Sequence, residues 1–347
     1  MQVGVVGLGL IGSYVAIRLS AAGVPVRAAG RRDLLPETIA ARRAYDLRGE
    51  SYIQNAPLRY HRHPIDVHGC DLILVAVKSS ASEAIRDSLP SGVPIVSLQN
   101  GLDNPARLQA ASSRHQVYGG VVTFNVRRGG GPSDPFGPDA YVQTTSGPIV
   151  LAARSLGEDA PHLPAHCLAA LRATGLVIKT TKDFDAAARA KLLLNLNNGV
   201  CAAAGVSVAD SIRDQRLRRV YAACIREGLA VFRARKERVG RIGPLAPGLI
   251  ARFLPLSDRV VALLARPMIQ IDPRARSSTL VDLEAGRITE ISELNGSIRA
   301  AGEALSIPCP ANAAVEAVVR ALEVEAQAAR PLSHIGPDAL LRRVWPQ

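Results

Sequence analysis

The chain opens with an apolar, strand-like run that leads directly into a glycine-rich turn, Gly7-Leu8-Gly9-Leu10-Ile11-Gly12. This spacing is typical of the strand–turn–helix that begins a dinucleotide-binding βαβ unit. We expect Gly7 to make the tight turn, Gly9 to let a pyrophosphate approach the backbone, and Gly12 to let the helix pack on the strand. The phosphates would lie at the helix N-terminus, where free N–H groups favour an anion. All six residues are therefore predicted cofactor contacts, with a glycine turn that binds nothing as the alternative.

The residues after the turn indicate which dinucleotide is bound. Residues 13–20 place apolar side chains at helical spacing, and residues 24–30 form a second strand-like run. A site selective for NAD usually carries an acidic residue about 20 residues after the glycines, whereas this chain has Gly30-Arg31-Arg32 there. A guanidinium group can bind the 2′-phosphate of NADP through two charge-assisted hydrogen bonds. The sequence predicts NADP(H), held by Arg31, while Arg32 is more simply explained as a surface residue.

Composition and charge exclude several classes of protein. The 347 residues are enough for two domains, and the apolar fraction of 48% can fill two cores. The formal charge of +12 would attract polyanions, but only 4% of the residues are aromatic and no basic run alternates with stacking side chains. We therefore expect no nucleic-acid partner. No apolar run reaches the about 18 residues of a membrane span, and no signal peptide is recognised, so we expect a cytoplasmic protein that binds no membrane.

The cysteines and histidines form no metal-binding motif. The five cysteines lie far apart, and neither a Cys-x-x-Cys pair nor a Cys/His ligand spacing occurs. His61, His63 and His68 fall in a proline-punctuated stretch that we expect to be a loop. The sequence therefore predicts neither a metal site nor a disulfide.

The first half of the chain alternates strand-like and helical segments, as a Rossmann-type domain does. Residues 71–78 form a continuous apolar run, which is typical of a parallel strand covered on both faces. A Gly/Pro/Asp-rich stretch at 127–139 is predicted to be a long flexible loop. Residues 141–145 and 148–152 are predicted to pair as a hairpin. Further strands are expected at 94–101, 117–125 and 177–180, and a helix at 162–173.

From residue 183 onward the apolar pattern becomes helical. The main helices are expected at 184–204, 213–236, 277–286, 291–304 and 312–329. The predicted fold class is α/β, with an N-terminal Rossmann-type dinucleotide-binding domain (residues 1–181) followed by an all-helical C-terminal domain (residues 182–347). Ligands of open α/β sheets bind at the carboxyl ends of the strands, so we expect the chemistry in the cleft between the two domains.

Five polar residues lie where they could reach a ligand. Lys78 and Asn100 each follow an apolar strand, although a polar residue at a strand end also has a plain structural explanation. Lys191, Asn195 and Asn198 stand at i, i+4 and i+7, which places an amine and two carboxamides on one face of an otherwise apolar helix. Asparagine is a poor helix former, so a polar stripe facing a ligand explains this choice better than a solvated surface does.

Two further segments begin helices and carry groups that could bind a substrate. Ser278 lies in a Ser-Ser pair and Glu290 in a Thr-Glu pair, and both pairs can be explained as helix caps and first-turn residues. Capping and ligand contact are compatible, because a helix N-terminus can also hold a carboxylate. Spacing alone leaves the role of Glu290 open.

In order along the chain, these motifs resemble the ketopantoate reductase (2-dehydropantoate 2-reductase) family. The resemblance extends from residue 1 to about residue 322. It implies reduction of ketopantoate to pantoate with NADPH, in the pantothenate route to coenzyme A, and a small-molecule 2-keto acid as the partner. The residues that carry it are Gly7, Gly9 and Gly12, Val77-Lys78-Ser79, Gln99-Asn100-Gly101, Lys191 and Asn195, Ser277-Ser278 and Asp282, Thr289-Glu290-Ile291, Asn295-Gly296, Gly302, Ile307-Pro308, Pro310 and Asn312.

The resemblance also implies a role for each matching residue. Lys191 would be the catalytic lysine that gives a proton to the keto oxygen, and Glu290 would engage the substrate hydroxyl. Ser278 and Asn195 would hold the polar groups of the substrate. Lys78 and Asn100 would bind the cofactor, and Asn100 would also contact the substrate. Arg31 would bind the 2′-phosphate of the cofactor. A cation beside the forming alkoxide stabilises charge that develops only in the transition state.

One departure from the family pattern bears on the substrate. Many members place a further asparagine eight residues after the catalytic lysine, where this chain has Gly199, and Asn198 is the candidate to replace it. A reductase of another 2-keto acid is therefore the first alternative. A catalytically silent, redox-sensing NADP-binding protein is the second, suggested only by the positive charge. Apolar faces in the helical half are compatible with a homodimer.

Overall fold

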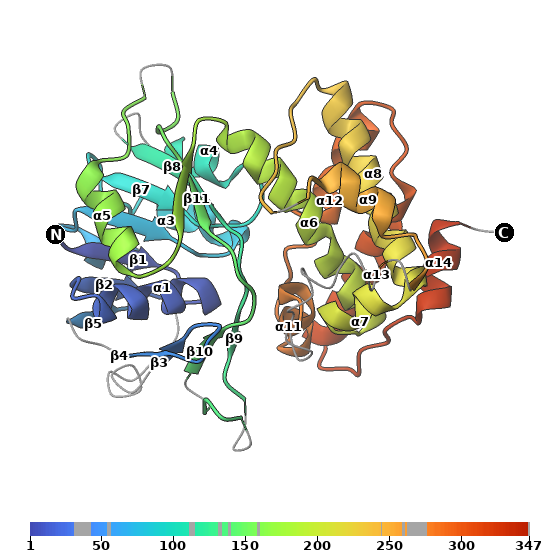
Figure 1. Cartoon of the computed structure of the whole chain (residues 1–347), viewed down its shortest axis with the longest axis horizontal. Helices are drawn as coiled ribbons and strands as arrows, with labels where there is room; N and C mark the ends of the chain where they lie inside the picture. Colours follow the sequence, from blue (N-terminus) through green and yellow to red (C-terminus); the bar gives the residue numbers. More distant parts are fainter. Residues whose placement is uncertain are drawn as a thin grey trace. The chain divides into compact units, whose positions relative to one another are not determined.

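The computed structural model describes residues 1–30, 43–53, 57–110, 115–130, 134–137, 140–157, 160–243, 245–258, 261 and 276–345. Arg31 and Arg32 lie outside these residues, so the predicted role of Arg31 has no structural counterpart here. The chain divides into two compact units, Met1–Phe184 and Asp185–Gln347. The sequence pattern placed the boundary near residue 181. Figure 1 shows the first unit in blue to green and the second in green to red.

The first unit is built on an eight-stranded sheet. Its strands lie in the order β12-β11-β8-β7-β6-β1-β2-β5, in which the six from β8 to β5 are parallel and β11 is antiparallel to β8. Parallel strands covered on both faces consist of apolar residues, as the fully buried β1 and β6 do. The strands are β1 (Val3–Val6), β2 (Val26–Ala29), β5 (Leu58–His61), β6 (Leu72–Val75), β7 (Pro94–Ser97), β8 (Gln116–Val122), β11 (Ile149–Ala152) and β12 (Ile178–Thr181).

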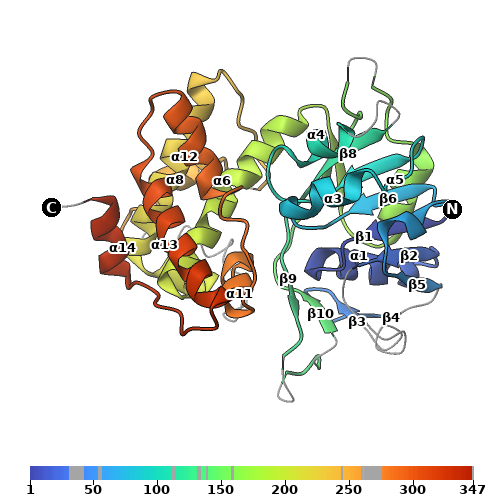
Figure 2. The same cartoon turned by 180° about the vertical axis from the view of Figure 1, so that it is seen from behind.

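Helices cover both faces of this sheet and bury two separate apolar cores. On one face, α1 (Leu10–Ala21) and α5 (Ala165–Ala173) pack against residues such as Val5, Leu74 and Leu151. On the other, α3 (Ser82–Arg86) and α4 (Asn104–Gln109) pack against residues such as Ile73 and Ile95. Figure 1 shows the first pair of helices and Figure 2, seen from behind, shows the second. This arrangement is the predicted Rossmann-type layer structure.

A second, four-stranded sheet corrects one of the sequence predictions. Its order is β4-β3-β10-β9, formed by β4 (Ser51–Ile53), β3 (Arg43–Tyr45), β10 (Ala140–Gln143) and β9 (Val126–Arg128). The predicted hairpin of residues 141–145 and 148–152 is wrong, because β10 belongs to this sheet whereas β11 belongs to the large one. The loop predicted after Arg127 begins after β9, and it connects the two strands of the β9–β10 hairpin. Within it, Asp134 accepts hydrogen bonds from Arg127 and from the Gly130 and Phe136 N–H groups.

The stretch that contains the histidines is also more regular than its composition suggested. Residues Leu58–His61 form β5, which pairs in parallel with β2 at the edge of the large sheet. The sequence pattern did not predict this strand, because polar residues occupy alternate positions in it. Such a pattern is possible at the edge of a sheet, where a strand is only partly buried. Among the described residues, no group of three or more His, Cys, Asp or Glu side chains could hold a metal ion. The five cysteines are buried and unpaired.

The second unit is helical and is organised around α6 (Phe184–Ala204), which begins and ends where the sequence predicted. Residues on nearly all sides of α6 are buried, as expected for a helix at the centre of a bundle. Figure 1 shows the neighbouring helices of this unit around it. These are α7 (Val208–Arg213), α8 (Gln215–Ala234), α9 (Pro247–Phe253), α11 (Ser278–Glu284), α12 (Asn295–Ala304), α13 (Pro310–Gln327) and α14 (Pro337–Val344).

Two predicted helices of this unit have different starts. The helix expected at 213–236 is α8 and begins two residues later, at Gln215, because Asp214 is extended (ψ 116°) and its carboxylate caps α8 by accepting from the Arg216 and Leu217 N–H groups. The helix expected from Ile291 begins at Asn295. Before it, the Glu290 carbonyl accepts hydrogen bonds from the N–H groups of Glu293 and Leu294, which closes a turn instead of a helix.

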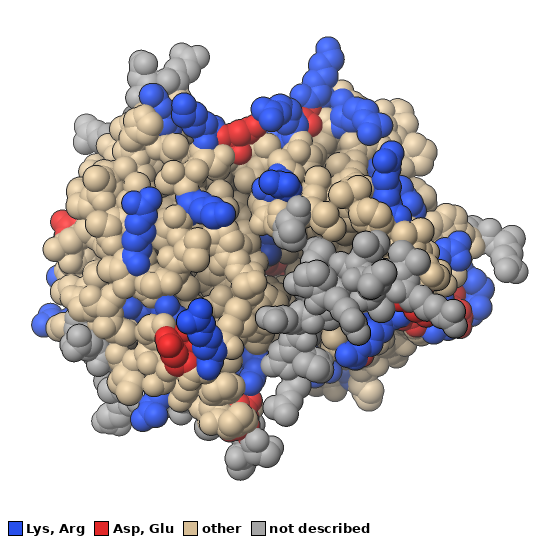
Figure 3. All heavy atoms as spheres, viewed as in Figure 1, with Lys and Arg blue, Asp and Glu red and all other residues tan. Residues whose placement is uncertain are grey.

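On the face shown in Figure 3, lysine and arginine side chains are spread among uncharged ones and do not gather in one continuous patch. No helix in the described part of the chain has the length and apolar character that crossing a membrane requires.

Candidate active site

The glycine turn after β1 has a different steric requirement at each glycine. Gly7 has φ +100°, and a Cβ there would lie 2.5 Å from the Val77 nitrogen. A Cβ on Gly12 would overlap the Gly7 carbonyl oxygen and lie 3.2 Å from the Ala76 Cβ, so α1 packs directly on the turn. A Cβ on Gly9 would meet no described atom within 4 Å. Two glycines are thus required by the fold, whereas the third leaves the backbone open beside the N-terminus of α1, where Gly9 is the N-cap.

The carboxyl ends of the central strands are tied together at one edge of the sheet. The Gly7 N–H donates to the Ala29 carbonyl (2.8 Å), the Ala76 N–H to the Val6 carbonyl (2.7 Å) and the Leu98 N–H to the Val75 carbonyl (2.8 Å). The glycine turn and the segments that follow β2, β6 and β7 therefore start from the same edge. This is the edge at which open parallel sheets bind their ligands.

Lys78 and Asn100 follow β6 and β7 at this edge, as the sequence predicted, and both are partly exposed. The segments that carry them are joined by a buried amide. Asn104, only 1% exposed, donates from Nδ2 to Ser79 Oγ (2.8 Å) and to the Asn100 carbonyl oxygen, and its Oδ1 accepts from Ser82 Oγ (3.1 Å). Because one side chain bonds to both segments, Asn104 fixes the separation of Lys78 and Asn100.

In the helical unit, Lys191 lies on α6 in surroundings that favour the neutral amine. The side chain is partly exposed at its surface but densely surrounded by protein, and burial lowers the pKa of Lys191 to about 8. Desolvation disfavours a charged amine, and among the described residues no acidic partner offsets the shift. A lysine with a pKa near neutrality can give up a proton readily, which suits a general acid.

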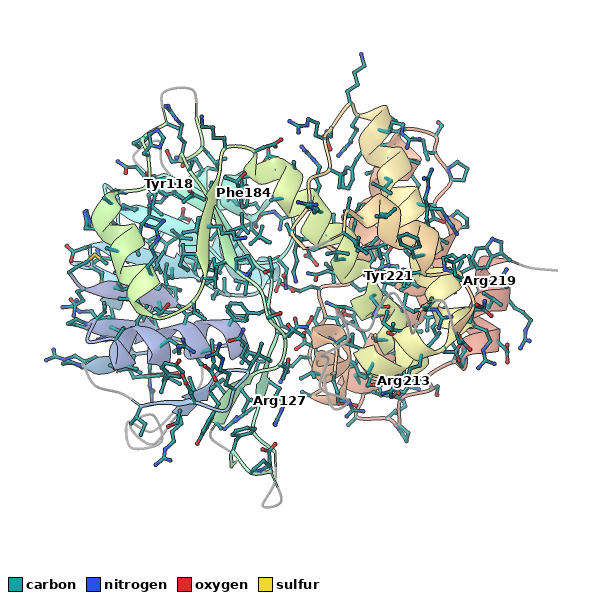
Figure 4. The ribbon with its side chains drawn as sticks, viewed as in Figure 1. Tyr118, Arg127, Phe184, Arg213, Arg219 and Tyr221 are labelled. Atoms are coloured by element: carbon teal, nitrogen blue, oxygen red, sulfur yellow. The ribbon has the colours of Figure 1, made fainter. Side chains whose placement is uncertain are left out.

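The asparagines of α6 divide into structural and accessible ones. Asn197 is buried and donates to Ser211 Oγ (2.9 Å), which ties α6 to α7. Asn195 is 9% exposed, and Asn198 is partly exposed. The backbone just before Asn195 is held by Tyr221 of α8, labelled in Figure 4, whose hydroxyl donates to the Leu194 carbonyl oxygen (3.0 Å). Lys191, Asn195 and Asn198 thus project from a helix whose backbone is anchored by its neighbours.

Asn198 also connects α6 to the start of α11. Its Nδ2 donates to Ser278 Oγ (3.4 Å), and its carbonyl oxygen accepts from Ser277 Oγ (3.1 Å). Ser277 is the N-cap of α11 and accepts from the Leu280 N–H (3.2 Å), so the cap explanation holds for this residue. Ser278, the next residue, is exposed. The structure therefore brings together two of the residues that the sequence singled out, 80 positions apart.

A side chain at position 199 would point into the packed later helices and not toward Ser278. A Cβ at this position would lie 2.5 Å from Asn295 Oδ1, 2.7 Å from Val315 Cγ1 and 2.9 Å from Ile291 Cδ1, all of them buried neighbours from the later helices. An asparagine at position 199 has no room in this chain. Asn198, one residue earlier, is the side chain that contacts the start of α11.

Glu290 lies in the turn before α12. Its neighbours Thr289 (6% exposed) and Ile291 (0%) are buried, whereas Glu290 itself is partly exposed. Thr289 is held by Glu323 of α13, which accepts from both the Thr289 N–H (2.7 Å) and its hydroxyl (2.6 Å). Glu290 thus belongs to a fixed backbone segment of the same unit that carries Lys191.

Two residues with clear roles in this arrangement were not singled out from the sequence. Asn104 begins α4 directly before a proline, and in a sequence this pattern reads as an ordinary helix start. Glu323 lies near the C-terminal end of an amphipathic helix sequence, where it resembles the nearby glutamate Glu325. Both act through bonds to residues far away in sequence, so a local pattern could not reveal them.

Comparison with known proteins identifies the family. The model of "Ketopantoate reductase PanE/ApbA" matches residues 3–155, and the model of its C-terminal part matches residues 183–323. The chain belongs to the ketopantoate reductase family. A relative, the 2-dehydropantoate 2-reductase of Archaeoglobus fulgidus, is 27% identical over 330 residues, which are 93% of this chain and 98% of the relative. The chain is therefore an oxidoreductase of this family.

Solved structures of the family have the same fold. A PanE/ApbA family ketopantoate reductase from Ralstonia eutropha superposes with a TM-score of 0.73 at 27% identity, over 94% of this chain and 100% of that one. A D-mandelate dehydrogenase, solved with NADH and anilino(oxo)acetate, has a TM-score of 0.72 at 19% identity, over 94% and 99% of the two chains. The second likeness concerns the fold alone.

Proposed function

We propose that this chain is an NADPH-dependent reductase that converts 2-dehydropantoate (ketopantoate) to pantoate. The observation that carries the proposal is Lys191, a lysine with a pKa of about 8 on the same helix face as Asn195 and Asn198. Catalysis of carbonyl reduction requires a proton donor near neutrality and polar groups that orient the substrate. The match to the family over both units supports ketopantoate as the substrate.

In this proposal the helical unit supplies the acid and the substrate contacts. When bound, the nicotinamide supplies a hydride to the C2 carbonyl carbon of the 2-keto acid, and the electron pair of the C=O double bond moves to oxygen. Lys191 donates the proton that converts this oxygen to the hydroxyl of the product. Its positive charge also stabilises the oxygen as negative charge develops there. Asn195, Asn198 and Ser278 hold the carboxylate, and Glu290 accepts a hydrogen bond from the substrate hydroxyl.

The first unit supplies the groups that fit a dinucleotide. The open backbone at Gly9 gives a pyrophosphate room beside the N-terminus of α1, which is an anion-binding arrangement. The rest of this glycine-rich segment consists of Gly7 and Leu8 in the turn and of Leu10, Ile11 and Gly12 at the start of α1. Lys78 and Asn100 lie at the same sheet edge and would contact the cofactor.

A preference for NADP(H) rests on Arg31. The residue comes two positions after Ala29, the last residue of β2, near where the ribose 2′ position of a dinucleotide lies in this type of fold. An arginine there favours a 2′-phosphate through bidentate hydrogen bonds. The D-mandelate dehydrogenase structures of the same fold contain NADH, so the proposed preference depends on Arg31 and not on the fold.

A second candidate function is the reduction of a different 2-keto acid. It is favoured by Gly199, because a side chain that many family members carry is missing and is sterically excluded here. Asn198 offers a carboxamide from an adjacent position on the helix. A shifted carboxamide changes the shape of the substrate site, so selectivity for another branched or functionalised 2-keto acid is the natural alternative.

The experiment that tests the proposal is NADPH oxidation by the purified protein, followed by absorbance, with ketopantoate and a panel of other 2-keto acids. NADH is run beside NADPH. The proposed function predicts the highest kcat/KM for ketopantoate with NADPH. A different 2-keto acid as the best substrate would favour the second candidate, and the absence of turnover with every acid would contradict both. Arg31→Ala should raise KM for NADPH and leave that for NADH unchanged, while equal effects on both would contradict the 2′-phosphate role.

A further inference from the structure

A carboxylate on α13 holds the turn that carries Glu290. Glu323 Oε1 accepts a hydrogen bond from the Thr289 N–H (2.7 Å) and another from the Thr289 hydroxyl (2.6 Å). The hydroxyl oxygen of Thr289 in turn accepts from the Ile291 N–H (3.1 Å). One carboxylate oxygen thus anchors a chain of three hydrogen bonds around the backbone of residues 289–291.

The anchoring restricts Glu290 from both sides. Thr289 is 6% exposed and Ile291 is fully buried, so neither neighbour can shift without loss of packing. The Glu290 carbonyl accepts from the Glu293 and Leu294 N–H groups (both 3.1 Å), which fixes the peptide that follows. The direction in which the Glu290 side chain leaves the backbone is therefore set by the Thr289–Glu323 contact and by this turn.

We propose that Glu323 is a positioning residue for Glu290 and thereby sets the preference of the enzyme for 2-keto acids that carry a hydroxyl group. The proposal rests on the proposed function, in which Glu290 accepts a hydrogen bond from the substrate hydroxyl. Hydrogen bonds to a charged group are stronger than those between neutral groups, which makes a carboxylate an effective anchor. Glu323 does not touch the substrate in this proposal and acts only through Thr289.

A purely structural role for Glu323 makes a different prediction. If the contact only ties α13 to the turn, its loss would weaken the reduction of every substrate to the same extent. If it positions Glu290, its loss affects a substrate with a hydroxyl much more than one without. Ketopantoate and 3,3-dimethyl-2-oxobutanoate provide this comparison, because they share the same branched 2-keto acid skeleton and differ only in that hydroxyl.

The test compares kcat/KM for these two acids, with NADPH, in wild-type enzyme and three variants. Glu323→Ala should lower kcat/KM for ketopantoate by roughly 10- to 100-fold, since a misplacement of about 1 Å can cost 100-fold. The value for 3,3-dimethyl-2-oxobutanoate should change by less than about threefold. Glu323→Gln keeps Oε1 as an acceptor for both Thr289 donors and should retain most of the wild-type ratio. Glu325→Ala is the matched control, because Glu325 lies on the same helix and accepts from the Ser333 N–H (2.7 Å).

Equal losses for both acids in Glu323→Ala, or a ratio that Glu323→Gln fails to restore, would overturn the inference. If Glu323→Ala does not fold, Thr289→Val replaces it, because this variant loses the hydroxyl that donates to Glu323 and keeps the backbone donor. The same shift in the ratio of the two kcat/KM values is then expected. An unchanged ratio counts against the proposal. A wild-type enzyme that does not reduce ketopantoate refutes the proposed function, and the inference with it, before any variant is compared.

Discussion

The two units present their candidate functional groups in opposite ways. In the first, the site is made by backbone and by missing side chains: the positive φ of Gly7, the close contact at Gly12 and the open space at Gly9. In the second, it is made by side chains on one well-anchored helix, Lys191 and Asn198 among them. Adding an atom therefore damages the first site, whereas removing atoms damages the second. The two kinds of substitution should separate binding from chemistry.

The largest expected effect is in the helical unit. Lys191→Ala should lower kcat by about 10²- to 10⁴-fold, the range that a general acid contributes, while the Kd for NADPH stays unchanged. In the wild type, proton donation requires the ammonium form, so kcat should fall as the pH rises through about 8, the pKa of Lys191. Steady-state rates and cofactor titration by fluorescence measure both quantities. Turnover that survives the substitution would refute the role of Lys191.

The contrast within the glycine turn comes next. Gly12→Ala forces a Cβ against the Gly7 carbonyl oxygen and should destabilise the fold by about 1–3 kcal/mol or more, as overpacking does. Gly9→Ala meets no described atom within 4 Å and should leave the melting temperature near that of wild type, but raise the Kd for NADPH. Thermal melts and binding titrations of the two variants distinguish the cases. Equal Kd values for Gly9→Ala and wild type would mean that no pyrophosphate approaches this residue.

A third substitution tests the departure at Gly199. Gly199→Asn should destabilise the fold by about 1–3 kcal/mol without improving kcat/KM, because its side chain meets Asn295, Val315 and Ile291. Asn198→Ala removes a side chain at the surface of the same helix and should leave the melting temperature nearly unchanged while raising KM for the 2-keto acid. Denaturant unfolding and steady-state kinetics provide the two readouts. A stable, more active Gly199→Asn would show that the position faces the substrate.

The smallest effect is expected for the amide that joins the cofactor segments. Asn104→Ala removes three hydrogen bonds in the first unit and should raise the Kd for NADPH by about tenfold, equivalent to about 1.4 kcal/mol. Gln109→Ala is the control, because Gln109 also lies on α4 but bonds to His115 and Val117 at the start of β8, away from that edge. Similar Kd values for NADPH in the two variants would contradict a positioning role for Asn104.

The sequence was sufficient for the parts of the molecule that are determined by local pattern. The glycine turn, the buried strands β1 and β6 and the full length of α6 follow from apolar periodicity and from the positions of glycine. What it missed depends on contacts between distant segments. The β9–β10 hairpin pairs with β3, a strand about 100 residues earlier, and a half-polar edge strand such as β5 resembles a loop until its neighbour is known.

The residues of the candidate site divide in the same way, into those that local pattern identified and those that only distant contacts identified. Lys191, Asn195 and Asn198 could be chosen because helical spacing places them on one face. The structural role of Asn197 could be recognised only from the position of α7, which contains Ser211. The interior position of Gly199 could be recognised only from the position of α13, which contains Val315. Glu323 could not be recognised at all, since its importance lies in a hydrogen bond to Thr289, 34 residues away.

The contacts of Gly199 have a consequence for how members of this family diverge. Residue 199 shares its space with residues 291, 295 and 315, so a larger side chain at 199 must be accompanied by smaller or differently placed neighbours. In an alignment of relatives, these four positions should vary as a correlated set, and the presence of asparagine at the first should coincide with changes at the others. The nature of the residue after Asn198 would then mark separate lineages, each with its own packing behind the substrate-facing helix.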